Sequence, residues 1–307
     1  MGDRTTFVIV DDPAAGHELY CSRSDTAGPD LDLLAGPGVV VPFIRSLDRD
    51  RASWVPQERY SGAALIDLRR RVLLWFARRG SVVEMRHRPA VFELLRRAWP
   101  GWDIRWSHEG VADLRTYLGP ALAADLPAVP QRPVRSGPGG IGEPSGAVAA
   151  SEAVSGAVVP SRIVDPGAEQ LAGPDPAVTV VTIDTDRCLV LGGREAHPIA
   201  EGPAVLPRLA GATDHGRYSG RAAAGLHIDT TRRRVGWWLL DAQAQAREMA
   251  KHWPTWTVEF WADDWQRHSQ VAGARFTPPA IDLGAALDTV HARAVEHWAT
   301  RGRPAAR

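Results

Sequence analysis

The chain carries one pattern of residues twice, and this repetition restricts its fold more than any other feature. The order and approximate spacing of the pattern are kept, so each half is a candidate folding unit. With 307 residues, the chain is long enough for two units that each bury a core. The matched segments are 59–62 with 217–220 (Arg-Tyr-Ser-Gly), 66–67 with 228–229 (Ile-Asp), 69–72 with 232–235 (three arginines and a valine), Trp75 with Trp238, and 99–102 with 253–256 (Trp-Pro-x-Trp).

The segment between the copies is rich in Pro, Gly, Ala and Ser and has few large apolar side chains. Such a segment cannot bury enough apolar surface to offset the entropy lost on ordering. We therefore predict a flexible linker at residues 121–176, which tethers a first α+β repeat at 1–120 to a second at 177–275. Residues 276–307 are predicted to form a C-terminal helix and tail, with no equivalent in the first copy.

Within each copy, hydrophobic periodicity predicts the order strand, strand, short helix, hairpin, helix, strand, helix. The clearest helix precedes Pro100, where Val91, Leu94, Leu95 and Ala98 share one face. The copies align without a gap from residue 99 to 119 and from 253 to 273. This order predicts an α+β fold with a mixed, mainly antiparallel sheet and helices on one face.

The overall composition argues against a large charged surface and against secretion. The chain has 36 basic and 36 acidic residues, so no global field attracts it to nucleic acid or to an acidic membrane. Its two cysteines, Cys21 and Cys188, are too few for a disulfide framework. No segment resembles a signal peptide or a membrane span. We expect a cytoplasmic protein that does not bind a membrane.

Two arginine triplets are the candidate anion-binding residues, because each lies at the tip of a predicted hairpin. Three adjacent guanidinium groups suit a phosphate or an acidic loop of a partner. The alternative is a solvated turn that Asp67 or Asp229 closes with its side chain. The triplets are Arg69, Arg70 and Arg71 in the first copy, and Arg232, Arg233 and Arg234 in the second.

The chain contains 12 tryptophans, and two of them occupy positions that are not aromatic in the first copy. Trp261 aligns with Ser107, on the predicted polar face of a strand, and Trp265 aligns with Val111. An exposed pair of tryptophans would mark a binding surface. Trp298, on the C-terminal helix, is a third candidate binding residue. The alternative is that this helix covers the pair.

The sequence shows no complete catalytic or metal-binding motif. Ser61 and Ser219 belong to the repeated motif, but histidines do not recur at matched positions, so no base is paired with either serine. A hydrolase or transferase would need a site assembled between the copies from one of these serines, Asp67 or Asp229, and an unpaired histidine such as His227. The spacing of cysteines and histidines predicts no metal, and no glycine-rich loop predicts a nucleotide cofactor.

These observations favour a non-enzymatic binding module, of the adaptor or immunity type, whose partner is another protein. The motivation is the duplication, the linker, the surplus of tryptophan and the incomplete catalytic motifs. Two alternatives stay open: a nucleotide or nucleic-acid binder that uses the arginine tips, and an enzyme with a site between the copies. Because shared residues are explained as framework, we expect function where the copies differ, at Trp261, Trp265 and His227 of the second copy and in the helix that ends near Trp298.

Overall fold

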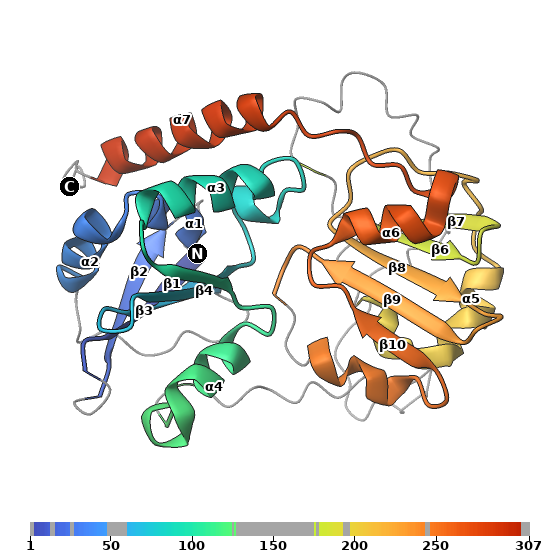
Figure 1. Cartoon of the computed structure of the whole chain (residues 1–307), viewed down its shortest axis with the longest axis horizontal. Coiled ribbons are helices and arrows are strands. Elements are labelled where there is room, and N and C mark those ends of the chain that lie inside the picture. The colour runs from blue at the N-terminus through green and yellow to red at the C-terminus, as the bar shows by residue number, and fades with distance from the viewer. Residues whose placement is uncertain are drawn as a thin grey trace, which may run out of the picture.

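The computed structural model describes residues 3–12, 16–24, 28–47, 60–124, 126, 175, 178–192, 197–242 and 246–301. Each copy contains a five-stranded sheet in which antiparallel and parallel strand pairs alternate (Figure 1). The strand order is β2-β1-β3-β4-β5 in the first sheet and β7-β6-β8-β9-β10 in the second, which is the same topology. The α+β class and the duplication are therefore confirmed.

The elements follow the predicted order, except that a 3-10 segment takes the place of the predicted helix before Trp253 in the second copy. The first copy consists of β1 (Asp3–Val10), β2 (Glu18–Ser24), α1 (Pro29–Leu33), α2 (Pro37–Arg45), β3 (Tyr60–Asp67), β4 (Val72–Ala77), a 3-10 turn (Ser81–Val83), α3 (Arg88–Ala98), β5 (Asp103–Trp106) and α4 (Val111–Leu122). The second consists of β6 (Val178–Ile183), β7 (Arg187–Gly192), a 3-10 segment (Pro198–Ala204), α5 (Val205–Ala210), β8 (Ala224–Asp229), β9 (Arg234–Leu239), a 3-10 segment (Ala246–His252), β10 (Thr257–Phe260), α6 (Trp265–Ala272) and a 3-10 turn (Gly273–Arg275). The C-terminal helix α7 spans Leu283–Arg301.

Alternation along the strands gives each sheet two apolar faces. In β1, Phe7 and Ile9 pack with the α3 side of the sheet, whereas Val8 and Val10 pack with the α4 side. The prediction placed helices on one face, and the structure adds α4 on the other. Gly119 adopts a φ of 78°, so α4 kinks there and continues to Leu122.

The strand register corrects one match between the copies. Ile66 faces Leu73 in the first hairpin and Ile228 faces Val235 in the second, so Trp75 is equivalent to Trp237 rather than to Trp238. The match by residue identity required a one-residue gap, whereas the two turns have the same length. Phe76 is therefore the first-copy equivalent of Trp238.

The described parts of the two copies form one body through reciprocal contacts. Arg88 at the start of α3 binds Asp263 of the second copy, with 2.6 Å between Nε and Oδ2. Arg247 of the second copy binds Glu109, with 3.0 Å between Nη1 and Oε2. Glu109 and Asp263 are equivalent in the gapless alignment, so the same position of each copy receives an arginine from the other. This arrangement resembles the two-fold interface of a homodimer.

Helix α7 leaves the second copy and packs on the first (Figure 1). Its apolar side chains Ala286 and Val290 are buried in the apolar cluster that also contains residues of α3 and of the first sheet. Each large apolar side chain buried in this way stabilises the fold by roughly 1.5–3 kcal/mol. Helix α7, which follows the second copy in the sequence, therefore stabilises the first copy.

Most of the predicted linker, 121–176, lies outside the described residues, as do residues 302–307 of the predicted tail. Residues 121 and 122 continue α4, so the first copy extends past residue 120. Asp175 is held by Arg221 of the second copy, with 2.8 Å between its Oδ1 and Nε. No helix in the described part of the chain has the length and apolar character needed to cross a membrane.

Candidate functional site

The arginine triplets lie on exposed turns of two separate sheets. Asp67 Oδ1 accepts a hydrogen bond from the backbone N–H of Arg70 at 2.8 Å, and Asp229 Oδ1 accepts one from Arg232 at the same distance. The aspartates thus close the turns, as the alternative interpretation of the triplets proposed. Several of these arginines also pair with acids, for example Arg234 with Glu259 at 2.6 Å. This pairing favours the solvated turn over an anion site.

The structure buries the two tryptophans of the expected exposed pair. Trp261 is 7% exposed and Trp265 is 6% exposed, and both pack in a cluster with Trp238 and with Met85 of the first copy. The hypothesis of an exposed pair is therefore corrected. The C-terminal helix does not cover them either, because α7 packs on α1 and α3. Their burial shows that the two tryptophans do not form an exposed docking surface for a partner protein.

The elements of the hypothetical hydrolase do not come together. Ser61 is buried and exchanges a hydrogen bond with Thr5 at 3.0 Å, while Ser219 is exposed in the second copy. Asp67 is fully buried and accepts a hydrogen bond from Tyr117 at 2.8 Å. Among the described residues, no hydrogen bond links either serine to a histidine, and no group of three His, Cys, Asp or Glu side chains is placed to hold a metal.

A chain of hydrogen bonds crosses the α6 face of the second sheet, and we call it the polar chain. Trp238 on β9 donates from Nε1 to His268 Nδ1 on α6 at 3.0 Å. His268 Nε2 lies 2.8 Å from the Thr182 hydroxyl on β6, and this hydroxyl lies 2.9 Å from His227 Nδ1 on β8. Four side chains from three strands and a helix are thus connected inside one core.

The first copy fills the same four positions with apolar side chains. The register makes Val8 the equivalent of Thr182 and Leu65 that of His227, and the gapless alignment makes Leu114 that of His268. Val8, Leu65, Phe76 and Leu114 form one fully buried apolar cluster. The fold therefore does not require polar groups here. Buried polar groups are stabilising only when fully hydrogen-bonded, so the second copy departs from the simpler solution.

Two glycines in the second copy make room for these changes. A side chain at Gly225 would collide with Trp238 Nε1 and His268 Nδ1, and the first copy has Ala63 there. A side chain at Gly236 would collide with the Trp261 ring, and the first copy has Leu74 there. Ser107 is the equivalent of Trp261. The first copy therefore has the large residue at position 74 and the small one at 107, whereas the second copy has the small residue at position 236 and the large one at 261. This exchange explains why a tryptophan fits the strand face predicted to be polar.

Burial keeps both histidines of the polar chain neutral. It lowers the pKa of His268 to about 3, helped by the charges of His227 and His197, and it also lowers the pKa of His227 against the influence of Asp229 and Asp184. The usual pKa of an unfolded histidine is about 6.5. At neutral pH the chain thus consists of uncharged groups.

We expect acid to destabilise the second copy through these histidines. Below about pH 6.5 these histidines bind protons in the unfolded chain but stay neutral in the folded chain. The free energy of unfolding therefore falls by up to about 1.4 kcal/mol per pH unit for each histidine. A transplant variant with first-copy residues (Thr182→Val, Gly225→Ala, His227→Leu, Trp238→Phe and His268→Leu) should lose less stability between about pH 6.5 and 4. Urea unfolding at several pH values measures both. Parallel pH profiles would contradict this assignment.

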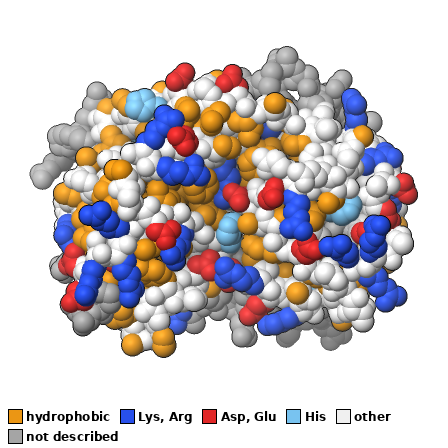
Figure 2. Space-filling view, viewed as in Figure 1, with side chains coloured by type: hydrophobic (Ala, Val, Ile, Leu, Met, Phe, Trp, Pro, Cys, Tyr) orange, Lys and Arg blue, Asp and Glu red, His pale blue; other side chains and the backbone are white. Residues whose placement is uncertain are grey.

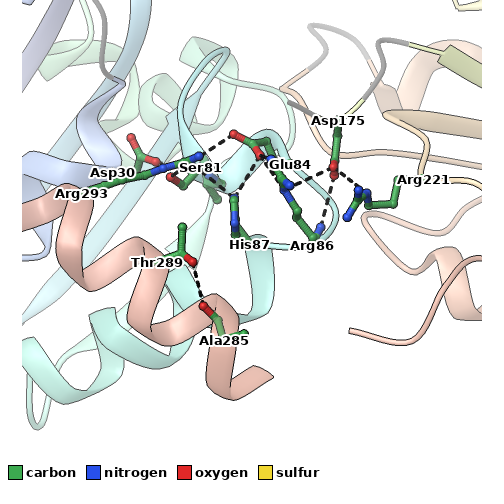
Figure 3. A network of polar contacts seen from close by, with 11 residues as sticks. Asp30, Ser81, Glu84, Arg86, His87, Asp175, Arg221, Ala285, Thr289 and Arg293 are labelled. Atoms are coloured by element: carbon green, nitrogen blue, oxygen red, sulfur yellow. Dashed lines mark hydrogen bonds and ion pairs between the residues drawn. The ribbon is translucent and has the colours of Figure 1, made fainter. Parts of the chain in front are cut away.

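A second polar network fixes helix α7 to both copies (Figure 3). Arg293 of α7 donates to Ser81 at 2.9 Å and to Glu84 at 3.2 Å. Burial raises the pKa of Glu84, but hydrogen bonds from His87 and Arg86 and the charge of Arg293 outweigh it and hold the pKa at about 2. Arg86 also pairs with Asp175 at 3.5 Å, which reaches the second copy.

The far end of α7 is anchored to a buried carboxylate of α1. Asp32 is fully buried and accepts from His297 Nε2 at 2.7 Å and from Arg301 Nη2 at 2.9 Å. Trp298 donates to the Leu31 carbonyl at 3.1 Å and packs its ring against Phe43. Helix α7 is therefore held along its whole length.

A groove of about 520 Å³ runs between α7, α3 and the end of α1. Its lining is mainly apolar and includes Trp298, so one of the three candidate tryptophans is close to a surface depression. Figure 2 shows apolar side chains exposed among scattered arginines and acids on one face of the molecule. The lining residues are Leu34, Ala35, Leu94, Arg97, Ala98, His291, Ala294, Val295 and Trp298.

Sequence reasoning singled out His227 and Trp298 but missed their surroundings. The sequence held one signal for the polar chain: the gapless alignment pairs His268 of the second copy with Leu114 of the first, so a polar residue replaces an apolar one there. The groove had no such signal, because α7 has no counterpart in the first copy. Comparison of the chain with protein-family models, curated proteins and solved structures found no match.

Proposed function

We propose that this chain is a non-enzymatic protein-binding module whose partner docks in the groove between α3 and α7. The observation that carries this proposal is Val295, a large apolar side chain that lines the groove and is 57% exposed. Leu94 and Trp298 lie in the same lining, so a partner side chain entering the groove would meet apolar surface on several sides. Such sites are where interfaces concentrate their binding energy.

The lining of the groove restricts the partner. Arg97 and His291 are the titratable side chains in the lining, and both are exposed. Because Arg97 is already paired with Glu93, at 2.9 Å between Nε and Oε1, the rim does not select a charged group, and an apolar side chain of the partner is what the groove matches. The anchors at Asp32 and Arg293 support the proposal further, because a wall held in place before binding costs little ordering entropy. Adaptors and immunity-type proteins are the two classes expected for such a module.

The test compares proteins captured by three forms of the full chain. Val295→Glu puts a negative charge into the groove and should weaken the partner at least about 30-fold, as loss of about 2 kcal/mol at a central contact implies. Val39→Glu is the matched control, because Val39 is 51% exposed on helix α2 and does not line the groove. A partner retained by the wild type and Val39→Glu, but lost from Val295→Glu, supports the proposal.

Calorimetry with the purified partner should reproduce that difference in affinity. Equal binding by Val295→Glu and Val39→Glu would rule out the groove. Capture of nucleic acid that is lost after charge reversal at Arg69–71 and Arg232–234 would instead support the arginine tips. The unfolding temperatures of both variants should stay close to that of the wild type, because both valines are exposed.

A further inference from the structure

We propose that the second copy carries a ligand site at the open end of the polar chain, where His227 donates a hydrogen bond from Nε2 to a neutral carbonyl oxygen. This site is separate from the groove between α3 and α7. It lies on the face of the second sheet that α6 covers, whereas the groove is built on the first copy.

The direction of every hydrogen bond in the polar chain is fixed by one group. An indole N–H can only donate, so Trp238 makes His268 Nδ1 an acceptor. Neutral His268 therefore carries its proton on Nε2 and donates it to Thr182. The hydroxyl of Thr182 then donates to His227 Nδ1, which leaves the proton of neutral His227 on Nε2.

Within the described part of the chain, His227 forms its hydrogen bond through Nδ1, which leaves Nε2 as the end of the polar chain for an outside group. His227 is half-buried, whereas its first-copy equivalent Leu65 is fully buried. In the first copy Tyr117 and Leu126 close this region over Asp67. The alignment places the exposed Val271 at the position of Tyr117, so the second copy lacks the tyrosine cover.

This protonation pattern selects the class of ligand. A histidine that carries its proton on the outer nitrogen offers no lone pair there, so it neither binds a metal nor accepts a proton at that atom. Asp184 and Asp229 are the charged groups that act on His227, and both are acidic. Asp229 is paired with Arg232 at 3.0 Å, whereas Asp184 accepts from the uncharged Thr230, so the charge of Asp184 disfavours carboxylates and phosphates. A neutral amide carbonyl, as in a peptide bond or an amide side chain, meets both conditions.

The neighbouring strand adds a flat apolar surface. Gly236 pairs with His227 across β8 and β9, and the ring of Trp261 occupies the space above this glycine. An amide plane that accepts from His227 would therefore lie near an indole. Aromatic side chains are favourable surfaces for such planar groups. Trp261, which occupies a strand face predicted to be polar, thus lies beside this site.

The first test is the tautomer of each histidine in the full chain, read from long-range ¹H–¹⁵N correlation spectra at about pH 7.5, above the usual histidine pKa. We expect both His227 and His268 to carry the proton on Nε2. Trp238→Phe removes the donor that sets the direction, so the His227 signals should become those of mixed tautomers, although Trp238 donates to His268 and not to His227. A proton on Nδ1 of His227 in the wild type would overturn the proposal.

The second test is titration with N-methylacetamide, with acetate and inorganic phosphate as the charged comparisons. The amide should give a saturable shift of the His227 Nε2 signal and of the Trp261 indole, and the two anions should give neither. Thr182→Val and Gly225→Ala should each weaken the amide about fivefold, as loss of a net hydrogen bond implies. In His227→Leu the response of Trp261 should disappear.

Three results would contradict the site: an unchanged Trp261 response in His227→Leu, a stronger response to acetate than to the amide, or no response to the amide in the wild type. Val295→Glu serves as the control and should leave the tautomers and the amide response unchanged. Because that variant alters only the groove, failure of this site and failure of the proposed function give different results.

Discussion

Replacing Arg88 with alanine is expected to lower the free energy of unfolding by about 3 kcal/mol, the lower end of the cost of breaking a buried ion pair, because Arg88 is buried but the side chain of Asp263 is 36% exposed. Arg88 is 1% exposed and binds Asp263 and the carbonyl oxygens of Val82 and Leu240. Its guanidinium also lies 4.4 Å from the Trp106 ring centroid. The substitution leaves these partners unsatisfied at the contact between the copies. Urea unfolding measures the loss.

The reciprocal arginine provides the matched control. Arg247 pairs with Glu109 and Asp113 at the corresponding contact, but its side chain is largely exposed. Exposed ion pairs contribute little, so Arg247→Ala should cost less than about 1 kcal/mol. Equal losses of unfolding free energy in Arg88→Ala and Arg247→Ala would show that burial of the arginine does not determine how much each contact contributes. A loss below about 1 kcal/mol for Arg88→Ala would contradict its role in joining the copies.

The second large effect is expected at Gly236. Gly236→Leu copies Leu74 of the first copy, but its side chain would occupy the space of the Trp261 ring. Overpacking of a well-filled core costs typically 1–3 kcal/mol and occasionally more, and we expect the upper end of this range. Trp261→Ser copies Ser107 and leaves a cavity, which costs about 3–5 kcal/mol.

Together the two substitutions should restore the first-copy pairing. Residues in contact are not additive, so we expect the double variant to be more stable than the sum of the single effects predicts by about 2 kcal/mol. Urea unfolding of the four proteins gives this coupling energy. Additive losses would mean that the coupling energy between positions 236 and 261 is zero, so the exchange of large and small residues would not contribute to stability.

The framework was readable from the sequence because it rests on local rules. Apolar alternation predicted the strands, and helical spacing at Val91, Leu94 and Leu95 predicted α3. Asp67 and Asp229 close their turns through the side chain, as residues of this type do. These features depend on neighbours in the chain, and the duplication displayed the strands and the closed turns twice, whereas the second copy has a 3-10 segment in place of α3.

Long-range arrangement was not readable in the same way. The helix predicted near Trp298 exists, but nothing local indicates that it crosses to the first copy and pairs with Asp32. The burial of Trp261 follows from a glycine on another strand, which becomes visible only when the strand register is known. His227 stood out as unmatched, yet its partner Thr182 is 45 residues away in the sequence, and Thr182 in turn bonds His268, which is 86 residues from it.

The measurement that most directly tests the central claim, that shared residues build the frame and differing residues serve function, is the unfolding free energy of the transplant variant at about pH 7.5, above the usual histidine pKa. Its five substitutions give the second copy the apolar solution that the first copy already uses. Cores tolerate simultaneous apolar replacement when volume and pattern are kept, so we predict a loss of no more than about 2 kcal/mol, together with loss of the N-methylacetamide response. A loss above about 5 kcal/mol would show that the polar chain holds the fold together and would contradict the account.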